Sequence, residues 1–195
     1  TDENFWHIYG LGQRGVNTAA VFPNWQSADA IPERAKLVAY GCDWGFTNDP
    51  TAIVSVWRED YSLYIEEHIY KTGMTNRDIS EELDKLELER TPIICDSAEP
   101  KSIEELHRLG HNVKPSKKGP DSIRLGIDIM KRHKLYILKD SLNAQKEFRN
   151  YRWEVDRNGT QLSKPVDKSN HIIDAVRYVC INRIGTAYTG KYYIT

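Results

Sequence analysis

The stretch LVAYGCDWGFTNDPTAIVSVW, residues 37–57, contains two apolar runs separated by a charged, turn-rich segment. The first run stops at Asp43, and the second, Thr51–Trp57, has the β-branched composition of a strand. Gly45 and Pro50 lie between them and are typical of a tight turn. An isolated carboxylate beside a core is costly unless it is paired or binds a metal. The stretch therefore predicts two neighbouring strands, with a carboxylate of functional interest where the first one ends.

The patterns on either side extend this pair into an α/β fold. Strands are predicted at Lys36–Cys42, Thr51–Arg58 and Leu63–Tyr70, and the short EDYS turn makes the last two a hairpin, so all three should be antiparallel. TPIICD is a short buried strand that ends at Asp96 and leads directly into a helix, as in a parallel strand–helix unit. We expect the later strands to join one edge of the sheet. The other predicted elements are helices at Thr75–Glu89, Lys101–Leu109, Asp121–His133, Ser141–Asn150 and Asn170–Ile184, and strands at Asn112–Lys114 and Leu135–Leu138.

Two further segments bear on domain organisation. Residues 1–35 show little periodicity and are interpreted as a linker or N-terminal extension from a missing domain, with the aromatic FWHIYGLGQRG at its start. Residues 36–195 form the expected folded domain. The sequence YRWEVDRNGTQLS predicts an extra β-hairpin turning at Asn158–Gly159. No stretch is long and apolar enough to cross a membrane.

The net charge of −1 conceals an uneven distribution. Residues 59–99 contain 12 acidic and 4 basic residues, whereas residues 101–152 contain 13 basic and 6 acidic ones. Such asymmetry permits a local basic surface, although ordinary solvated helix faces would give the same counts. The basic loop KPSKKGP precedes a predicted helix, and lysines at a helix start suit phosphate groups. The candidate DNA-binding residues are Lys114, Lys117, Lys118, Arg124 and, at the hairpin tip, Arg157.

The three cysteines, Cys42, Cys95 and Cys180, lie in apolar surroundings and form no CxxC pair. This pattern predicts buried, reduced thiols and disfavours a structural zinc site.

Carboxylates recur at strand ends and in one helix. Asp43 and Asp96 each end an apolar strand, so their side chains converge if the two strands are neighbours. In DKSNHIIDAVRY, residues 167–178, Asp167, His171 and Asp174 are spaced i, i+4, i+7 and share a face if the helix extends that far back.

Oxygen ligands of this kind suit Mg²⁺ or Mn²⁺, and a pair of such ions can cleave a phosphodiester bond. Each aspartate also has a structural alternative. Asp43 could cap a turn, Asp96 could cap a helix, and Asp174 could pair with Arg177.

Four motifs, CDWGFTNDPTAIV, IICDSAEPKSIEEL, KKGPDSIRLGI and NHIIDAVRY, resemble the C-terminal nuclease domain of tailed-bacteriophage terminase large subunits over roughly residues 37–184. The resemblance implies an RNase H-like α/β fold with a mixed central sheet. It implies an endonuclease that cuts concatemeric double-stranded viral DNA in the host bacterial cytoplasm, using two Mg²⁺ or Mn²⁺ ions. Asp43, Asp96 and Asp174 would be the catalytic metal ligands, and His171 a ligand or an orienting group. The implied partners are DNA, a packaging ATPase domain, the terminase small subunit and the portal protein.

Other readings remain open at this point. A Holliday-junction resolvase or transposase-like core would use the same acids, and a non-catalytic docking module could share the fold. DWGFT also matches the phosphate loop of sugar kinases and actin-like ATPases, but DSAEP lacks the glycine that their second loop needs. GTAYTGKY has the spacing of a P-loop, but Tyr192 replaces the required Ser or Thr.

Overall fold

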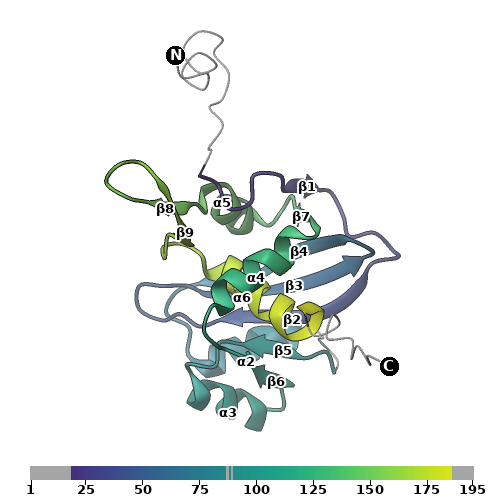
Figure 1. Ribbon diagram of the computed structural model, residues 1–195. Helices are drawn as coiled ribbons and strands as arrows, with labels where there is room; N and C mark the ends of the chain where they lie inside the picture. Colours follow the sequence, from purple (N-terminus) through teal and green to yellow (C-terminus); the bar gives the residue numbers. More distant parts are fainter. Residues whose placement is uncertain (1–18, 87, 89, 186–195) are drawn as a thin grey trace, which may run out of the picture.

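The computed structural model describes residues 19–185 except 87 and 89, and a seven-stranded mixed sheet forms its centre (Figure 1). Strands β2 (Lys36–Asp43), β3 (Thr51–Glu59) and β4 (Ser62–Lys71) pair antiparallel, as the sequence predicts. Residues 51–56 of β3 are all buried, because helices cover both faces of the sheet. The second apolar run of residues 37–57 thus lies in the middle of the core.

The parallel strands lie on both sides of this antiparallel centre. β5 (Ile93–Cys95) pairs with β2, and β6 (Val113–Pro115) pairs with β5. β7 (Lys134–Leu138) pairs instead with β4 at the opposite side. The expectation that all later strands join one edge was therefore wrong, because the chain crosses the sheet between β6 and β7 and reaches the free edge of β4.

An additional strand, β1 (Gln26–Ala28), pairs parallel with β7 and completes the order β1-β7-β4-β3-β2-β5-β6. The segment before it is held by two backbone hydrogen bonds. Val21 N–H donates to the Tyr151 carbonyl at 2.9 Å, and Trp153 N–H donates to the Ala19 carbonyl at 2.8 Å. Residues 19–35, expected to be linker, therefore contribute to the fold, whereas FWHIYGLGQRG at 5–15 lies outside the described residues.

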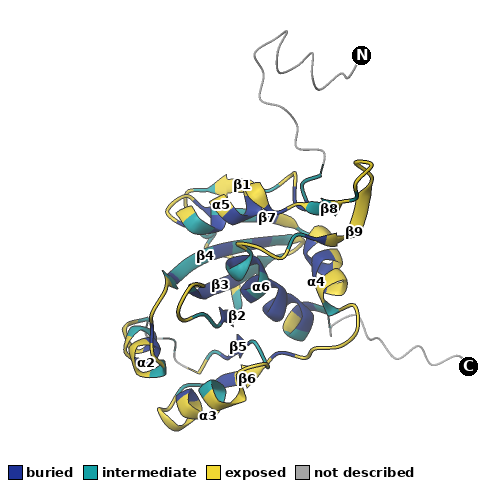
Figure 2. Cartoon of the chain, turned by 90° about the vertical axis from the view of Figure 1, so that its left-hand side faces the viewer, coloured by how far each residue is buried: buried dark blue, intermediate teal, exposed yellow. Residues whose placement is uncertain are grey.

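Helices form a layer on each face of the sheet. α2 (Asn76–Lys85) and α3 (Pro100–Arg108) cover one face. α4 (Ser122–Lys131), α5 (Leu142–Asn150) and α6 (His171–Val179) cover the other. Figure 2 shows that α6 is the most buried of them, whereas α2 and α3 expose their outer sides. The predicted helices are present, with α2 ending at Lys85 and α6 continuing into a π-helical turn, Cys180–Ile184.

The predicted hairpin is confirmed as β8 (Trp153–Val155) and β9 (Gln161–Pro165), a separate antiparallel pair that projects from the domain (Figure 1). Gly159 adopts φ +80° at its tip, a conformation that suits glycine. The three cysteines are buried and free, as predicted. None of the helices among the described residues is both long and apolar enough for a membrane span.

Candidate metal centre

Asp43 and Asp96 lie side by side at the carboxyl ends of two parallel strands. Cys42 in β2 is paired with Cys95 in β5, and the next amide, Asp96 N–H, donates to the Cys42 carbonyl at 3.1 Å. Both cysteines point into the core on the α2/α3 face. The alternation of side chains along β2 therefore turns Asp43 toward the opposite face, which α6 covers.

Helix α6 brings its polar residues onto this strand end because it lies unusually close to β2. A Cβ atom on Gly41 would come within 2.2 Å of the Ala175 carbonyl oxygen, so only glycine allows this approach. His171 Nδ1 then lies 3.0 Å from Asp43 Oδ2. One turn and two turns further along α6, Asp174 and Tyr178 follow, and the Tyr178 hydroxyl donates to Asp43 Oδ1 at 3.2 Å.

Each of the three aspartates has a basic partner of its own. Asp43 has His171, and Asp96 forms an ion pair with Lys118 of the basic loop. Asp174 forms a two-pronged ion pair with the buried guanidinium of Arg177, at 2.9 Å and 3.1 Å. The pairing of Asp174 with Arg177, predicted as the structural alternative for this aspartate, is therefore present. Asp96 accepts from the Ala98 amide at 2.8 Å but does not cap α3, whose N-cap is Glu99.

The electrostatics of the centre reflect crowding of negative charge at a buried place. Burial raises the pKa of Asp43, and the nearby charges of Asp174 and Asp96 raise it further, while the hydrogen bond from His171 opposes the rise. The same hydrogen bond to Asp43 raises the pKa of His171. The carboxylate of Asp43 is thus held in a place where additional positive charge would stabilise its ionised form.

The donor set fits hard divalent cations, which prefer carboxylate oxygens. The three carboxylates come from three different elements, and the charges of Asp174 and Asp96 both raise the pKa of Asp43. Within the part of the chain that the structure describes, no three His, Cys, Asp or Glu side chains are already oriented around one point as a ligand set. A cation bound here would compete with Lys118 for Asp96 and with Arg177 for Asp174.

Glu147 of α5 is a residue of this centre that the sequence did not reveal. It is 2% exposed, and its Oε2 accepts hydrogen bonds from the Ile172 and Ile173 amides at 2.8 Å and 3.2 Å. Its Oε1 accepts from the Tyr70 hydroxyl at 2.9 Å. Because Asn170, the N-cap residue of α6, makes no side-chain cap, Glu147 caps this helix from another element. It thereby fixes the turn that carries His171 and Asp174.

The other predicted residues are distributed around the centre at different distances. Lys118 reaches it, and the Lys117 amide donates to Asn182 Oδ1 at 3.0 Å, which ties the basic loop to the end of α6. Arg157 lies in the exposed hairpin tip. Asp167 precedes α6, which begins only at His171, so the expected three-residue face does not extend back to it. Lys114 in β6 and Arg124 in α4 are exposed.

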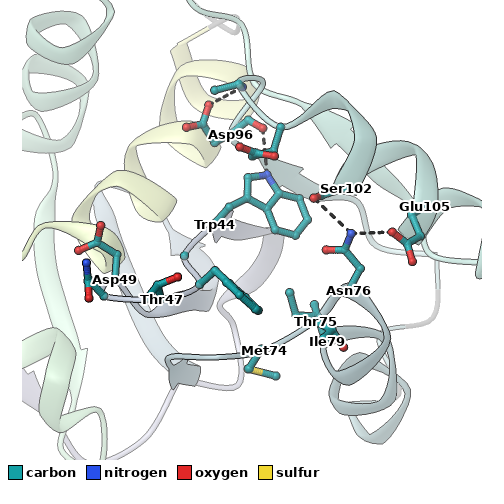
Figure 3. Close-up of a pocket in the computed structure, with 15 residues that line it drawn as sticks. Trp44, Thr47, Asp49, Met74, Thr75, Asn76, Ile79, Asp96, Ser102 and Glu105 are labelled. Carbon is teal, nitrogen blue, oxygen red and sulfur yellow. Dashed lines mark hydrogen bonds between the residues drawn. The ribbon is translucent and has the colours of Figure 1, made fainter.

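A hollow of about 700 Å³ opens beside the aspartates, between the β2–β3 turn and helices α2 and α3 (Figure 3). Trp44 and Phe46 contribute aromatic surface, and Trp44 Nε1–H donates to the Asp96 carbonyl at 3.0 Å. The acidic residues of its lining are Asp49, Asp96, Glu99 and Glu105. Since none of the described lining residues is basic, this side of the centre repels phosphate groups.

The family described as "Terminase RNAseH like domain" matches residues 43–180, a range that begins at Asp43 and includes Asp96, His171 and Asp174. This chain belongs to the terminase RNase H-like domain family. The predicted resemblance and the predicted RNase H-like α/β fold are both confirmed.

Two curated relatives are terminase large subunits. The chain is 31% identical over 186 residues to the terminase large subunit of Bacillus phage SPP1, covering 88% of this chain and 43% of that protein. It is 27% identical over 187 residues to the PBSX phage terminase large subunit of Bacillus subtilis strain 168, covering 91% of this chain and 43% of that protein. The chain thus spans less than half the length of the curated relatives it matches.

Solved structures agree with this assignment. The nuclease domain of the SPP1 large terminase, crystallised with bound Mn, has a TM-score of 0.71 and 28% identity, covering 81% of this chain and 96% of that one. The large terminase of a thermophilic bacteriophage has a TM-score of 0.65 at 21% identity, covering 91% of this chain and 48% of that one. This second likeness supports the fold alone.

Proposed function

We propose that this terminase domain is a Mg²⁺- or Mn²⁺-dependent endonuclease that hydrolyses phosphodiester bonds of concatemeric double-stranded viral DNA during genome packaging. The convergence of Asp43, Asp96 and Asp174 carries the proposal, because three carboxylates from separate elements suit hard cations. The Mn bound to the SPP1 nuclease domain supports the same choice of cofactor. Two ions held here would activate a water molecule and stabilise the leaving oxygen.

In this proposal the residues of the chain have distinct tasks. Asp43, Asp96 and Asp174 hold the ions. His171 either binds an ion or orients Asp43 through the hydrogen bond that joins them. Lys118 turns from Asp96 to a DNA phosphate, with Lys114, Lys117, Arg124 and Arg157 as further backbone contacts.

The proposed partners and location are supported by the relatives rather than by the site. We infer that a packaging ATPase domain precedes this domain in the complete protein, because the chain spans only 43% of the SPP1 relative and 46% of a solved large terminase that binds ADP. The terminase small subunit, the portal protein and a host bacterial cytoplasm complete the proposal.

Digestion of plasmid DNA with Mn²⁺, Mg²⁺ or EDTA tests the activity directly. Asp96→Asn is the most informative variant, because Asp96 lies in a loop and its replacement leaves only the partly exposed Lys118 without a partner. We expect loss of metal-dependent cutting, with Asp128→Asn on the exposed side of α4 as the matched control. Cutting by Asp96→Asn at the wild-type rate would remove Asp96 from the centre.

The same substitution at Asp43 should also abolish cutting. Asp174→Asn needs a parallel measurement of folding, because it leaves the 3% exposed Arg177 without its carboxylate. A wild-type chain that never cuts DNA with either metal would favour a non-catalytic docking module.

A further inference from the structure

A second pocket lies at the other end of the sheet from the aspartates. It has a volume of about 580 Å³ and is formed by the segment before β1, the β3–β4 turn and the connection from α4 to β7. Its basic residues are Lys131, Arg132, His133 and Lys134, and none of its described lining residues is acidic. This pocket is therefore the electrostatic opposite of the acidic hollow beside Asp96.

Two of the cationic groups of this pocket are available to a ligand, whereas the Lys131 ammonium lies 5.0 Å from the centre of the Trp153 ring. Arg132 and Lys134 are exposed, and neither side chain forms an ion pair within residues 19–185, leaving aside 87 and 89. The position of Lys134 is fixed by its backbone, because its amide donates to the Tyr61 carbonyl at 2.8 Å. The pocket therefore presents unneutralised positive charge on a backbone whose position is held.

Neutral groups in the pocket complete a surface typical of nucleic-acid backbone binding. Tyr61 is 67% exposed, Trp25 is partly buried, and its neighbour in sequence, Asn24, is exposed in the same lining. Arginine, lysine, tyrosine and asparagine side chains are common donors to phosphate and sugar oxygens in protein–DNA complexes. An aromatic face beside them can pack against a deoxyribose.

The pocket is connected to the metal centre by a single helix. α4 begins just after the basic loop whose Lys118 contacts Asp96, and it ends at Lys131 in the pocket lining (Figure 1). Ala52 of β3 pairs with Asp43, and β3 continues for seven residues to Glu59, next to the turn that contains Tyr61, which corresponds to roughly 23 Å at ~3.3 Å per residue. At ~3.4 Å per base pair this is about seven base pairs, less than one turn of B-DNA.

We propose that this basic pocket is a second DNA-backbone site, which holds the duplex within one helical turn of the phosphate that is cut. The proposal rests on the proposed nuclease function, since it assigns the same substrate to a second place on the domain. It also accounts for the composition of the pocket, because none of its described lining residues is acidic. The pocket otherwise has no part in the metal centre.

Fluorescence anisotropy with a labelled 24-base-pair duplex in EDTA tests this site without using catalysis. The variant Arg132→Ala/Lys134→Ala should bind more weakly, and its plot of log affinity against log salt should be shallower by about 1 to 2, since each lost phosphate contact removes ~0.9. The matched control is Arg77→Ala/Lys101→Ala, which removes the same charge from the exposed sides of α2 and α3 and should leave the slope unchanged. Arg132→Lys/Lys134→Arg should retain the wild-type slope.

Three results would overturn the proposal. The first is a wild-type chain that does not bind the duplex. The second is a salt slope in Arg132→Ala/Lys134→Ala that equals the wild-type slope. The third is a change of the same size in the control variant Arg77→Ala/Lys101→Ala. Any of them can be told apart from failure of the nuclease function, which would appear as absence of cutting by wild-type protein with Mn²⁺. If the true ligand of the pocket is an acidic protein segment, the salt slope of the alanine variant will be unchanged.

Discussion

Replacing Glu147 by alanine should destabilise the domain more than any surface change, because it removes the cap of α6. The Ile172 and Ile173 amides would lose their acceptor in a buried place, and the Tyr70 hydroxyl would lose its partner. Each unsatisfied buried donor costs ~1–3 kcal/mol. Counting the two amides at the low end and adding the lost side-chain packing, we expect a loss of about 3 kcal/mol in the free energy of unfolding.

Glu147→Gln separates the effect of hydrogen bonding from that of charge and shape. The amide oxygen of glutamine can still accept from the Ile172 amide, so we expect a smaller loss of about 1 kcal/mol. Glu82→Ala, at an exposed ion pair with Lys85 on α2, should leave the stability close to that of wild type and serves as the control.

Urea and thermal unfolding measure these losses, and hydrogen exchange locates them. For a domain of this size ~1 kcal/mol shifts the midpoint by about 2–4 °C, so Glu147→Ala should melt about 6–12 °C below wild type. The amides of Ile172 and Ile173 should exchange faster in the variant. If the melting temperature falls by less than ~2 °C and these two amides keep their protection, the capping role is refuted.

Three further variants and one substrate experiment are informative. Gly41→Ala should loosen α6 from the sheet and cost about 1–3 kcal/mol, measured by urea unfolding, because the new methyl group meets a backbone carbonyl. Lys118→Ala should strengthen Mn²⁺ binding in calorimetry by up to about fivefold, since a partly exposed ion pair worth ~1 kcal/mol no longer competes for the carboxylate; weaker binding would contradict this. Replacing Arg157–Thr160 by a neutral tight turn should change the cleavage rate but leave calorimetric Mn²⁺ affinity unchanged. Random-sequence linear DNA should be cut to a smear that fades as salt rises, whereas discrete bands would require base-specific contacts.

The centre of the fold could be predicted from sequence because its signals are local. The runs that form β2 and β3 are apolar and β-branched, and each carboxylate of interest stands directly at the end of such a run. Strand β1 gave no such signal. Its sequence, QSA, is polar and short, and it is held by backbone pairing with β7, more than a hundred residues later in the chain.

The parts of the site that escaped prediction depend on contacts between distant segments. Glu147 lies 25 residues before Ile172 in the helix that it caps, and on α5 it looks like an ordinary helix-forming glutamate. The placement of β7 beside β4 is likewise undetermined by hydrophobic periodicity, which identifies a strand but not its neighbour. The pairing of Asp174 with Arg177 was foreseeable, because residues at i and i+3 share a helix face.

The short bridge between residues 19–21 and 151–153 has a mechanical consequence. A pulling force applied upstream of Ala19 would first load the two hydrogen bonds to Tyr151 and Trp153. Trp153 begins β8, so the load would pass into the hairpin. Strands β2 and β5, which position Asp43 and Asp96, are separated from β1 by β7, β4 and β3. A pulling force applied upstream of Ala19 would therefore displace the hairpin, while Asp43 and Asp96 keep their distance from each other.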